Sequence, residues 1–252
     1  MQLAPALRRM RAAHWLALYA GIGLAWAGLL AMQLPPELLA AAEFYGAEFW
    51  EALCRVEPGL ASVSALFAMW ALMAAAMMAP TVLPALATWE DLVQAGHAAG
   101  FARLLAGYLA VWLGFAALAT GAQVALADAG LLTPLGASAS PFLSAGLLAA
   151  AGLYQFSPLK AACLAKCRRP LVFFLAHWDD GPWRMGLRLG AVCLGCCWAL
   201  MALAFVGGTM NLLWMGGAMV LMALEKLPGL GQHLTYPLGC ALLGAALAAL
   251  LI

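Results

Sequence analysis

Three cysteines and a methionine lie within nine residues of an otherwise apolar stretch, CLGCCWALM at 193–201. On a helix, Cys193, Cys197 and Met201 recur every four residues and share one stripe, and Cys196 lies one turn after Cys193. The side chains of Cys196 and Cys197 are expected to point apart, because neighbouring helical residues are about 100° apart. The stripe extends over roughly 12 Å of the helix axis.

This stripe offers sulfur ligands without a charged neighbour. Thiolate and thioether groups prefer Cu(I) to the harder divalent cations. A thiol in hydrocarbon otherwise stays protonated and unreactive, whereas a bound cation displaces its proton. Free cysteine also packs as a small hydrophobe where helices approach closely. The pattern therefore predicts either a row of copper(I) ligands along the helix or a close contact between helices.

A second sulfur stripe, MWALMAAAMMAP at 69–80, lies earlier in the sequence. Its methionines recur at helical spacing or adjoin one that does: Met69, Met73, Met77 and Met78. Pro80 removes a backbone N–H and is expected to kink the helix. Met77 and Cys193 are both expected roughly 10 to 15 Å deep from the inner face, so that they face each other. Filling gaps in a core is the alternative role for these methionines.

Further methionines lie in the apolar segment 209–225, at Met210, Met215, Met219 and Met222. Met210 is a candidate ligand at the end of this segment that we expect to face the outside of a membrane. Its neighbour Asn211 is expected to make a polar contact there. At the opposite end of the segment, Glu225 and Lys226 are expected to form an ion pair at the membrane boundary. Alternatively, the Glu225 carboxylate holds a cation there.

Two more cysteines lie near positive charge in YQFSPLKAACLAKC at 154–167. Cys163 and Cys167 are one turn apart on a helix that restarts after Pro158. The flanking basic residues are Lys160, Lys166, Arg168 and Arg169. We expect this pair to exchange metal at the cytoplasmic face or to act as a redox pair, and a plain interfacial anchor is the alternative.

The other polar residues give no sign of catalysis. The histidines fall at the edges of apolar segments, at His14, His97, His177 and His233. This argues against haem held between helices, and a solvated loop is expected around His177. No nucleotide-binding glycine loop, serine elbow or HExxH motif is present. We therefore do not expect the chain alone to be an enzyme.

Composition identifies the medium in which these residues must work. The 252 residues are 66% apolar and 9% charged, against about 25% charged in an average soluble domain. A net charge of +1 without a basic stripe excludes a nucleic-acid partner. Seven cysteines, an odd number, do not fit a disulfide framework. The chain is expected to be a membrane protein, with the lipid bilayer as its surroundings.

Runs of about 20 apolar residues, the length that crosses a bilayer, predict the fold. We expect an all-α, polytopic helical bundle that forms a single membrane domain over 1–252. An amphipathic helix at 36–57 is expected on the outer leaflet. Seven spans are predicted, at 15–34, 61–86, 101–127, 141–159, 186–207, 209–225 and 234–252.

Basic residues predict the orientation, because lysine and arginine accumulate in cytoplasmic loops. With a cytoplasmic N-terminus, Arg55 alone of the twelve basic residues lies outside. The basic start and apolar run of the first span also resemble a secretory signal, but its length favours a retained anchor. The predicted location is the bacterial inner membrane, with several spans.

The chain resembles the bacterial integral membrane proteins that are predicted to bind metal, one branch of which is associated with copper delivery to a tyrosinase-type enzyme. The matching segments are MWALMAAAMMAP, YQFSPLKAACLAKCRRP, CLGCCWALM, GTMNLLWM and EK, in that order between about 60 and 230. The resemblance implies a helical membrane fold, copper as cargo, and a copper enzyme or soluble metallochaperone as partner.

Three functions are compatible with these observations. The leading one is a Cu(I)-handling membrane protein, in which core sulfurs hold the ion and Cys163 with Cys167 exchange it. The second is a membrane anchor or assembly subunit of a copper-dependent oxidase or monooxygenase. The third is a scaffold in which cysteine and methionine only pack.

Overall fold

The computed structural model describes residues 12–32, 60–93 and 98–251. Within these ranges the regular structure is helical, and the one pairing outside helices is an isolated bridge between Leu132 and Ser138. The predicted all-α class is confirmed. The predicted outer helix at 36–57 lies outside the described residues.

The helices follow the apolar runs of the sequence. Their bounds are α2 (Ala13–Ala31), α5 (Leu60–Val93), α6 (Ala98–Asp128), α7 (Pro141–Gln155), α8 (Pro158–Cys167), α9 (Pro170–Ala176), η2 (Trp178–Asp180), α10 (Gly181–Ala202), α11 (Ala204–Gly207), α12 (Leu212–Glu225) and α13 (Gly231–Leu251). Five helical stretches of the described chain are long and apolar enough to cross a membrane, and the bent pair α7–α8 raises the total to six.

The sixth predicted span, 209–225, corresponds to α12, which has 14 residues. At 1.5 Å per residue it extends about 21 Å, less than the roughly 30 Å of a hydrocarbon core. The predicted span 141–159 is likewise not one straight helix, because α7 and α8 meet at 64° around Ser157 and Pro158.

The predicted break between residues 207 and 211 is present. Gly208 has a φ of 91°, a conformation that favours glycine. Asn211 then caps α12, because its side-chain oxygen accepts a hydrogen bond of 3.1 Å from the Trp214 N–H. Asn211 therefore makes the polar contact expected of it.

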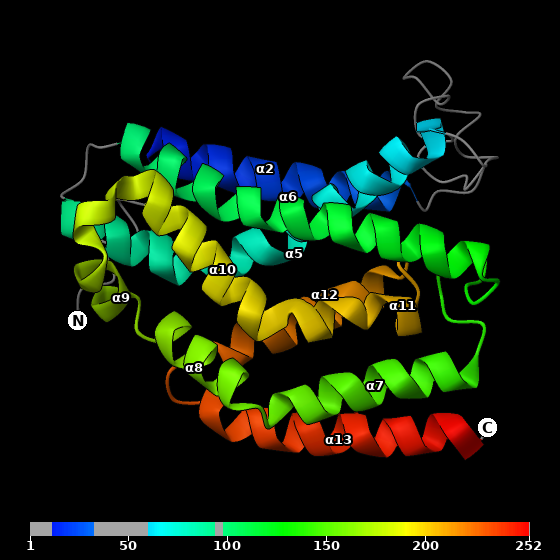
Figure 1. Cartoon of the computed structure of the whole chain (residues 1–252). Helices are drawn as coiled ribbons and strands as arrows, with labels where there is room; N and C mark the ends of the chain where they lie inside the picture. The colour runs from blue at the N-terminus through cyan, green and yellow to red at the C-terminus, as the bar shows by residue number, and fades with distance from the viewer. Residues whose placement is uncertain (1–11, 33–59, 94–97, 252) are drawn as a thin grey trace.

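Figure 1 shows the helices arranged roughly along one axis, with α7 and α13 antiparallel on one side and α2, α5 and α6 on the other. Between these groups, α10 packs extensively on α6 and also touches α8. One end of the bundle holds α9 and the first turns of α6 and α10. We call it the basic end, because it carries Arg103, Arg168, Arg169, Arg184 and Arg188.

A seam of glycines lets α10 approach α6 closely. A Cβ on Gly190 would lie 2.9 Å from the carbonyl oxygen of Tyr108, and one on Gly186 would collide with the carbonyl of Leu104. Small residues at such positions allow two membrane helices to come into backbone contact. The seam fixes the next turn of α10, which carries Cys193, against Tyr108.

Helix α5 continues through Pro80 and Pro84. A proline leaves the carbonyl four residues earlier without its helical partner. For Pro80 that carbonyl belongs to Ala76, and the indole N–H of Trp26 on α2 donates to it at 3.0 Å. A neighbouring helix thus satisfies the backbone group that the proline frees.

Candidate metal centre

Three thiols of α10 meet in the interior. The Sγ atoms of Cys193, Cys196 and Cys197 all lie within 4.8 Å of one another, and each residue is buried. Cys196 and Cys197 approach to 3.2 Å between sulfurs. The expectation that these two side chains point apart was therefore wrong. Their Cα–Cβ bonds diverge around the helix, but the two sulfurs turn toward each other.

The spacing suits one soft ion. Metal–thiolate bonds of about 2.3 Å, as in zinc sites, place two ligand sulfurs at most about 4.6 Å apart. Three sulfurs that share one ion at this bond length lie about 4.0 Å apart in a trigonal arrangement. The Cys196–Cys197 pair must therefore open from 3.2 Å, while all three sulfurs already lie within 4.8 Å. Sulfur-only donor sets favour Cu(I), zinc or iron–sulfur clusters over hard cations.

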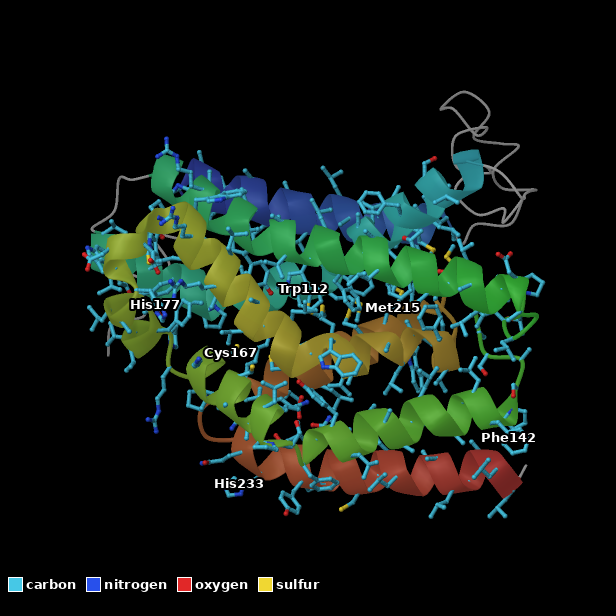
Figure 2. The ribbon with its side chains drawn as sticks, in the orientation of Figure 1. Trp112, Phe142, Cys167, His177, Met215 and His233 are labelled. Carbon is cyan, nitrogen blue, oxygen red and sulfur yellow. The ribbon has the colours of Figure 1, made fainter. Side chains whose placement is uncertain are left out.

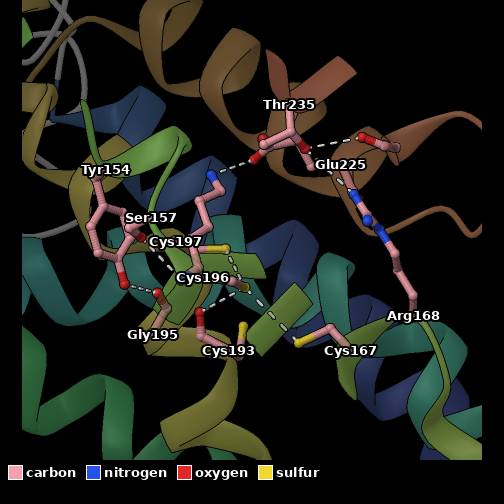
Figure 3. Close-up of polar contacts among 12 residues, drawn as sticks. Tyr154, Ser157, Cys167, Arg168, Cys193, Gly195, Cys196, Cys197, Glu225 and Thr235 are labelled. Carbon is pink, nitrogen blue, oxygen red and sulfur yellow. Dashed lines mark hydrogen bonds and ion pairs between the residues drawn. The ribbon is translucent and has the colours of Figure 1, made fainter. Parts of the chain in front are cut away.

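Helix α8 brings a fourth sulfur. The thiol of Cys167 lies 3.9 Å from that of Cys196. One turn earlier, Cys163 faces the backbone of Gly195, where an added Cβ would come within 2.7 Å of its sulfur. Figure 3 shows Cys167 directed at the α10 cysteines. The two α8 cysteines were predicted to form a separate exchange site, but Cys167 adjoins the α10 cluster.

Two features of α8 produce this approach. The side chain of Ser157 caps the helix by accepting the Lys160 N–H at 3.1 Å, and Pro158 occupies the first turn. The 64° bend between α7 and α8 then carries α8 across to α10, and Figure 2 shows Cys167 between these two helices.

A buried ion pair locks α8 to α12. The Lys160 ammonium lies 2.8 Å from a Glu225 carboxylate oxygen, and both side chains are 1% exposed. Arg168 at the end of α8 also donates to the main-chain oxygen of Glu225 at 2.9 Å. Glu225 therefore pairs with Lys160, whereas the sequence suggested its neighbour Lys226 or a bound cation.

Lys226 instead faces the cysteines. Its ammonium donates to the Thr81 hydroxyl at 2.7 Å and to the Cys193 sulfur at 3.0 Å. The hydroxyl of Tyr108 lies 3.0 Å from the same sulfur and donates to the Met78 carbonyl at 3.1 Å. The Cys193 sulfur thus contacts hydrogen-bonding groups from α6 and from the end of α12, and α5 in turn holds both groups through Met78 and Thr81.

Sequence reasoning missed Tyr108 and Thr81 as neighbours of the site, and it named Lys160 only as a flanking charge and not as the partner of Glu225. A signal was present for each, because a polar atom inside an apolar run must find a partner. The partner could not be read from the sequence, since each contact joins helices that are distant along the chain.

A cavity of about 240 Å³ opens beside the cluster. Cys193 and Cys167 both line it, so it reaches sulfurs from two helices. Its polar lining also includes Thr81, Tyr108, Arg168 and Lys226. Leu227 and Pro228, just after α12, lie at its rim.

The predicted methionine ligands occupy two environments. Most are buried in the core, namely Met73, Met77, Met78 and Met201. Met210 is half-buried and lines a different pocket, with Met32 and Asn211, where α2 ends and α12 begins. From α5, the Met78 carbonyl accepts from Tyr108 and the Thr81 hydroxyl accepts from Lys226, the two residues that contact the Cys193 sulfur.

The described histidines are not part of the cluster, and His97 lies outside the described residues. Among the described residues, the one group of cysteine, histidine and acidic side chains spaced to hold a metal is the α10 cluster. His177 bonds the Phe173 carbonyl at 2.8 Å, and Asp180 pairs with Arg188 at 2.9 Å. His14 lies 2.8 Å from the Glu90 carboxylate.

Comparison with known proteins gives one match. A family model described as PpoB2, copper chaperone, matches residues 67–249. No curated protein and no solved structure matches the chain. The matched range begins within α5 and ends within α13, and it therefore contains all five clustered or adjoining cysteines.

Proposed function

The chain belongs to the PpoB2 copper-chaperone family, and from this premise we propose that it holds copper(I) on thiols inside a membrane bundle and passes the ion to a partner. Cys193, Cys196 and Cys197 are the core ligands in this proposal. Cys167 joins or replaces one of them during transfer.

The observation that carries the proposal is the convergence of four thiols from two helices. Their sulfurs lie at separations that one ion can bridge after small shifts. Pure packing does not require this convergence, since cysteines that only fill space need not direct their sulfurs at one another. Sulfur-only ligands favour the reduced copper ion.

Exchange of one thiol ligand for another gives the ion a path from α10 to α8. Cys196 lies between Cys197 at 3.2 Å and Cys167 at 3.9 Å. An ion bound by the α10 thiols can therefore gain Cys167 before it loses Cys197, so it never lacks a sulfur partner. Each thiol that binds copper releases its proton, which makes loading dependent on pH.

We also propose a cellular location for the protein and a path for the copper ion. The helices of the described chain that are long enough to span a bilayer suggest a membrane protein, and we propose a bacterial inner-membrane location with the basic end in the cytoplasm. Met73, Met77, Met78, Met201 and Met210 are proposed as weaker thioether contacts toward the other end.

The decisive experiment measures copper in the protein purified in neutral detergent under reducing conditions. The wild-type protein should retain about one copper per chain, and the variant with Cys193→Ser and Cys197→Ser should retain none. Cys240→Ser is the matched control, because Cys240 is exposed on α13. Equal copper content in wild type and double variant would remove the proposed site, provided that both variants melt near the wild-type temperature.

A further inference from the structure

The cavity beside Cys193 has a positively charged lining. Lys226 and Arg168 contribute their cations to it, and no acidic residue is among its described lining residues. The carboxylate of Glu225 does not compensate Lys226, because it is bonded to Lys160 at 2.8 Å. Lys226 is half-buried, and its described contacts are a hydroxyl and a thiol.

This charge conflicts with the passage of a bare copper(I) cation. Like charges repel across a low-dielectric cavity more strongly than in water. An anionic ligand, by contrast, is concentrated by a cleft lined with charge of the opposite sign. Copper(I) bound by two thiolates carries one negative charge at the metal centre, so it is attracted where the free ion is repelled.

We infer that this cavity receives copper(I) as the anionic complex of a small thiol, and that Lys226 selects for its negative charge. The inference rests on the proposed copper-binding function and adds the chemical form of the cargo. The hydroxyls of Thr81 and Tyr108 also line the cavity, but both donate to the Met78 carbonyl, at 2.9 and 3.1 Å. The groups left to attract an anion are therefore the cations of Lys226 and Arg168.

The size of the cavity restricts the carrier. Its 240 Å³ lies below the roughly 300–1,000 Å³ of pockets that hold drug-sized ligands. A thiol of a few heavy atoms fits, whereas a folded protein loop does not. The ligand is therefore a low-molecular-weight thiol and not the cysteine loop of a protein.

Transfer is a balanced ligand exchange. Cys193 and Cys167 both reach the cavity from the protein side. Two new copper–sulfur bonds form to protein thiols, and the two bonds to the carrier break. The two protons that the protein thiols release go to the two departing thiolates. Copper stays in the +1 state, and the complex keeps its single negative charge at the metal.

The test compares two carriers whose end groups have opposite charge. Copper(I) is offered anaerobically to the full-length protein in neutral detergent as its complex with 3-mercaptopropionate or with cysteamine. Both thiols have two methylene groups after the sulfur, but one ends in a carboxylate and the other in an ammonium group. The wild-type protein should load about tenfold faster from the anionic complex, and added salt should reduce this preference.

Lys226→Gln should abolish most of the preference, which is read as the ratio of the two loading rates within this variant, because Lys226 also contacts the Cys193 sulfur. Arg188→Gln is the control, because Arg188 lies near the basic end, pairs with Asp180 and does not line the cavity. Equal loading of wild type from both carriers would overturn the inference while the copper-binding function stood. Failure to load from either carrier would overturn both. The salt series on wild type decides the question if the Lys226 variant does not fold.

Discussion

Two lysines near the cysteines occupy opposite situations. Lys160 is fully buried, and its charge is neutralised by Glu225 across the contact of α8 with α12. Lys226 is the residue after Glu225, yet it faces the cavity and contacts Thr81 and Cys193. The comparison separates a charge that holds helices together from a charge that is left facing a cavity.

Helix geometry explains how neighbours come to differ. Consecutive residues at the end of α12 point about 100° apart. Glu225 is therefore directed toward α8, and Lys226 toward α5 and α10. A buried ion pair stabilises only as a complete pair, because an unpaired charge in the interior is strongly unfavourable. A charge beside a cavity can instead be stabilised by an incoming ligand.

Glu225→Gln should have the largest effect on stability. It leaves the Lys160 ammonium buried without a counter-charge, which costs about 3–5 kcal/mol. Lys226→Gln removes hydrogen bonds at a half-buried position and should cost about 1 kcal/mol or less. Unfolding by SDS titration, with the thermal midpoint as a second measure, compares the two. Similar losses for both variants would mean that Lys226 is also a structural charge.

Gly186→Ala should lower stability by an intermediate amount, and its structural effect should be limited to the part of α10 beside the cavity. A Cβ at this position collides with the α6 backbone, so α10 must shift, and overpacking of this kind costs about 1–3 kcal/mol. The shift moves Cys193 relative to Tyr108 and should weaken copper binding, but it spares the Lys160–Glu225 pair.

The matched control for the seam is Gly121→Ala on α6, where an added Cβ meets nothing within 4 Å. This variant should keep both stability and copper affinity. Isothermal competition with a copper(I) chelator measures the affinity. If Gly186→Ala binds copper like the control, the seam does not position Cys193.

Met77→Leu should have the smallest effect. The swap nearly conserves volume and should cost less than about 1.5 kcal/mol. Because the clustered thiols supply the main ligands in the proposed function, the copper content should stay at the wild-type level, with at most a few-fold loss of affinity in the same competition assay. Complete loss of copper would transfer the principal ligand role to the methionines of α5.

Much of the fold could be predicted from sequence. Long apolar runs specify helices in a bilayer, because each helix satisfies its own backbone groups there. The break at Gly208 and Asn211 was predicted from residue types that act locally. The short length of α12 was not predicted from sequence. The apolar run extends before Asn211, but the helix begins only after that residue.

The candidate site could be predicted only in part. Cys193 and Cys197 share a helical stripe by spacing alone, and the structure brings their sulfurs together with that of Cys196. The arrival of Cys167 depends on the bend at Pro158 and on the Lys160–Glu225 pair, which joins residues 65 positions apart. Spacing along one helix contains no information about such contacts.

By itself the sequence determined the helical class, the apolar character of the helices and the candidate sulfur ligands, because these follow from composition and from local periodicity. Only the tertiary structure decided which sulfurs meet and which lysine faces them. The physical reason is that helix pairing in an apolar medium depends on small seams, such as the one between α6 and α10, and on a few buried polar contacts. Those contacts link distant residues, so they exist only once the helices are packed.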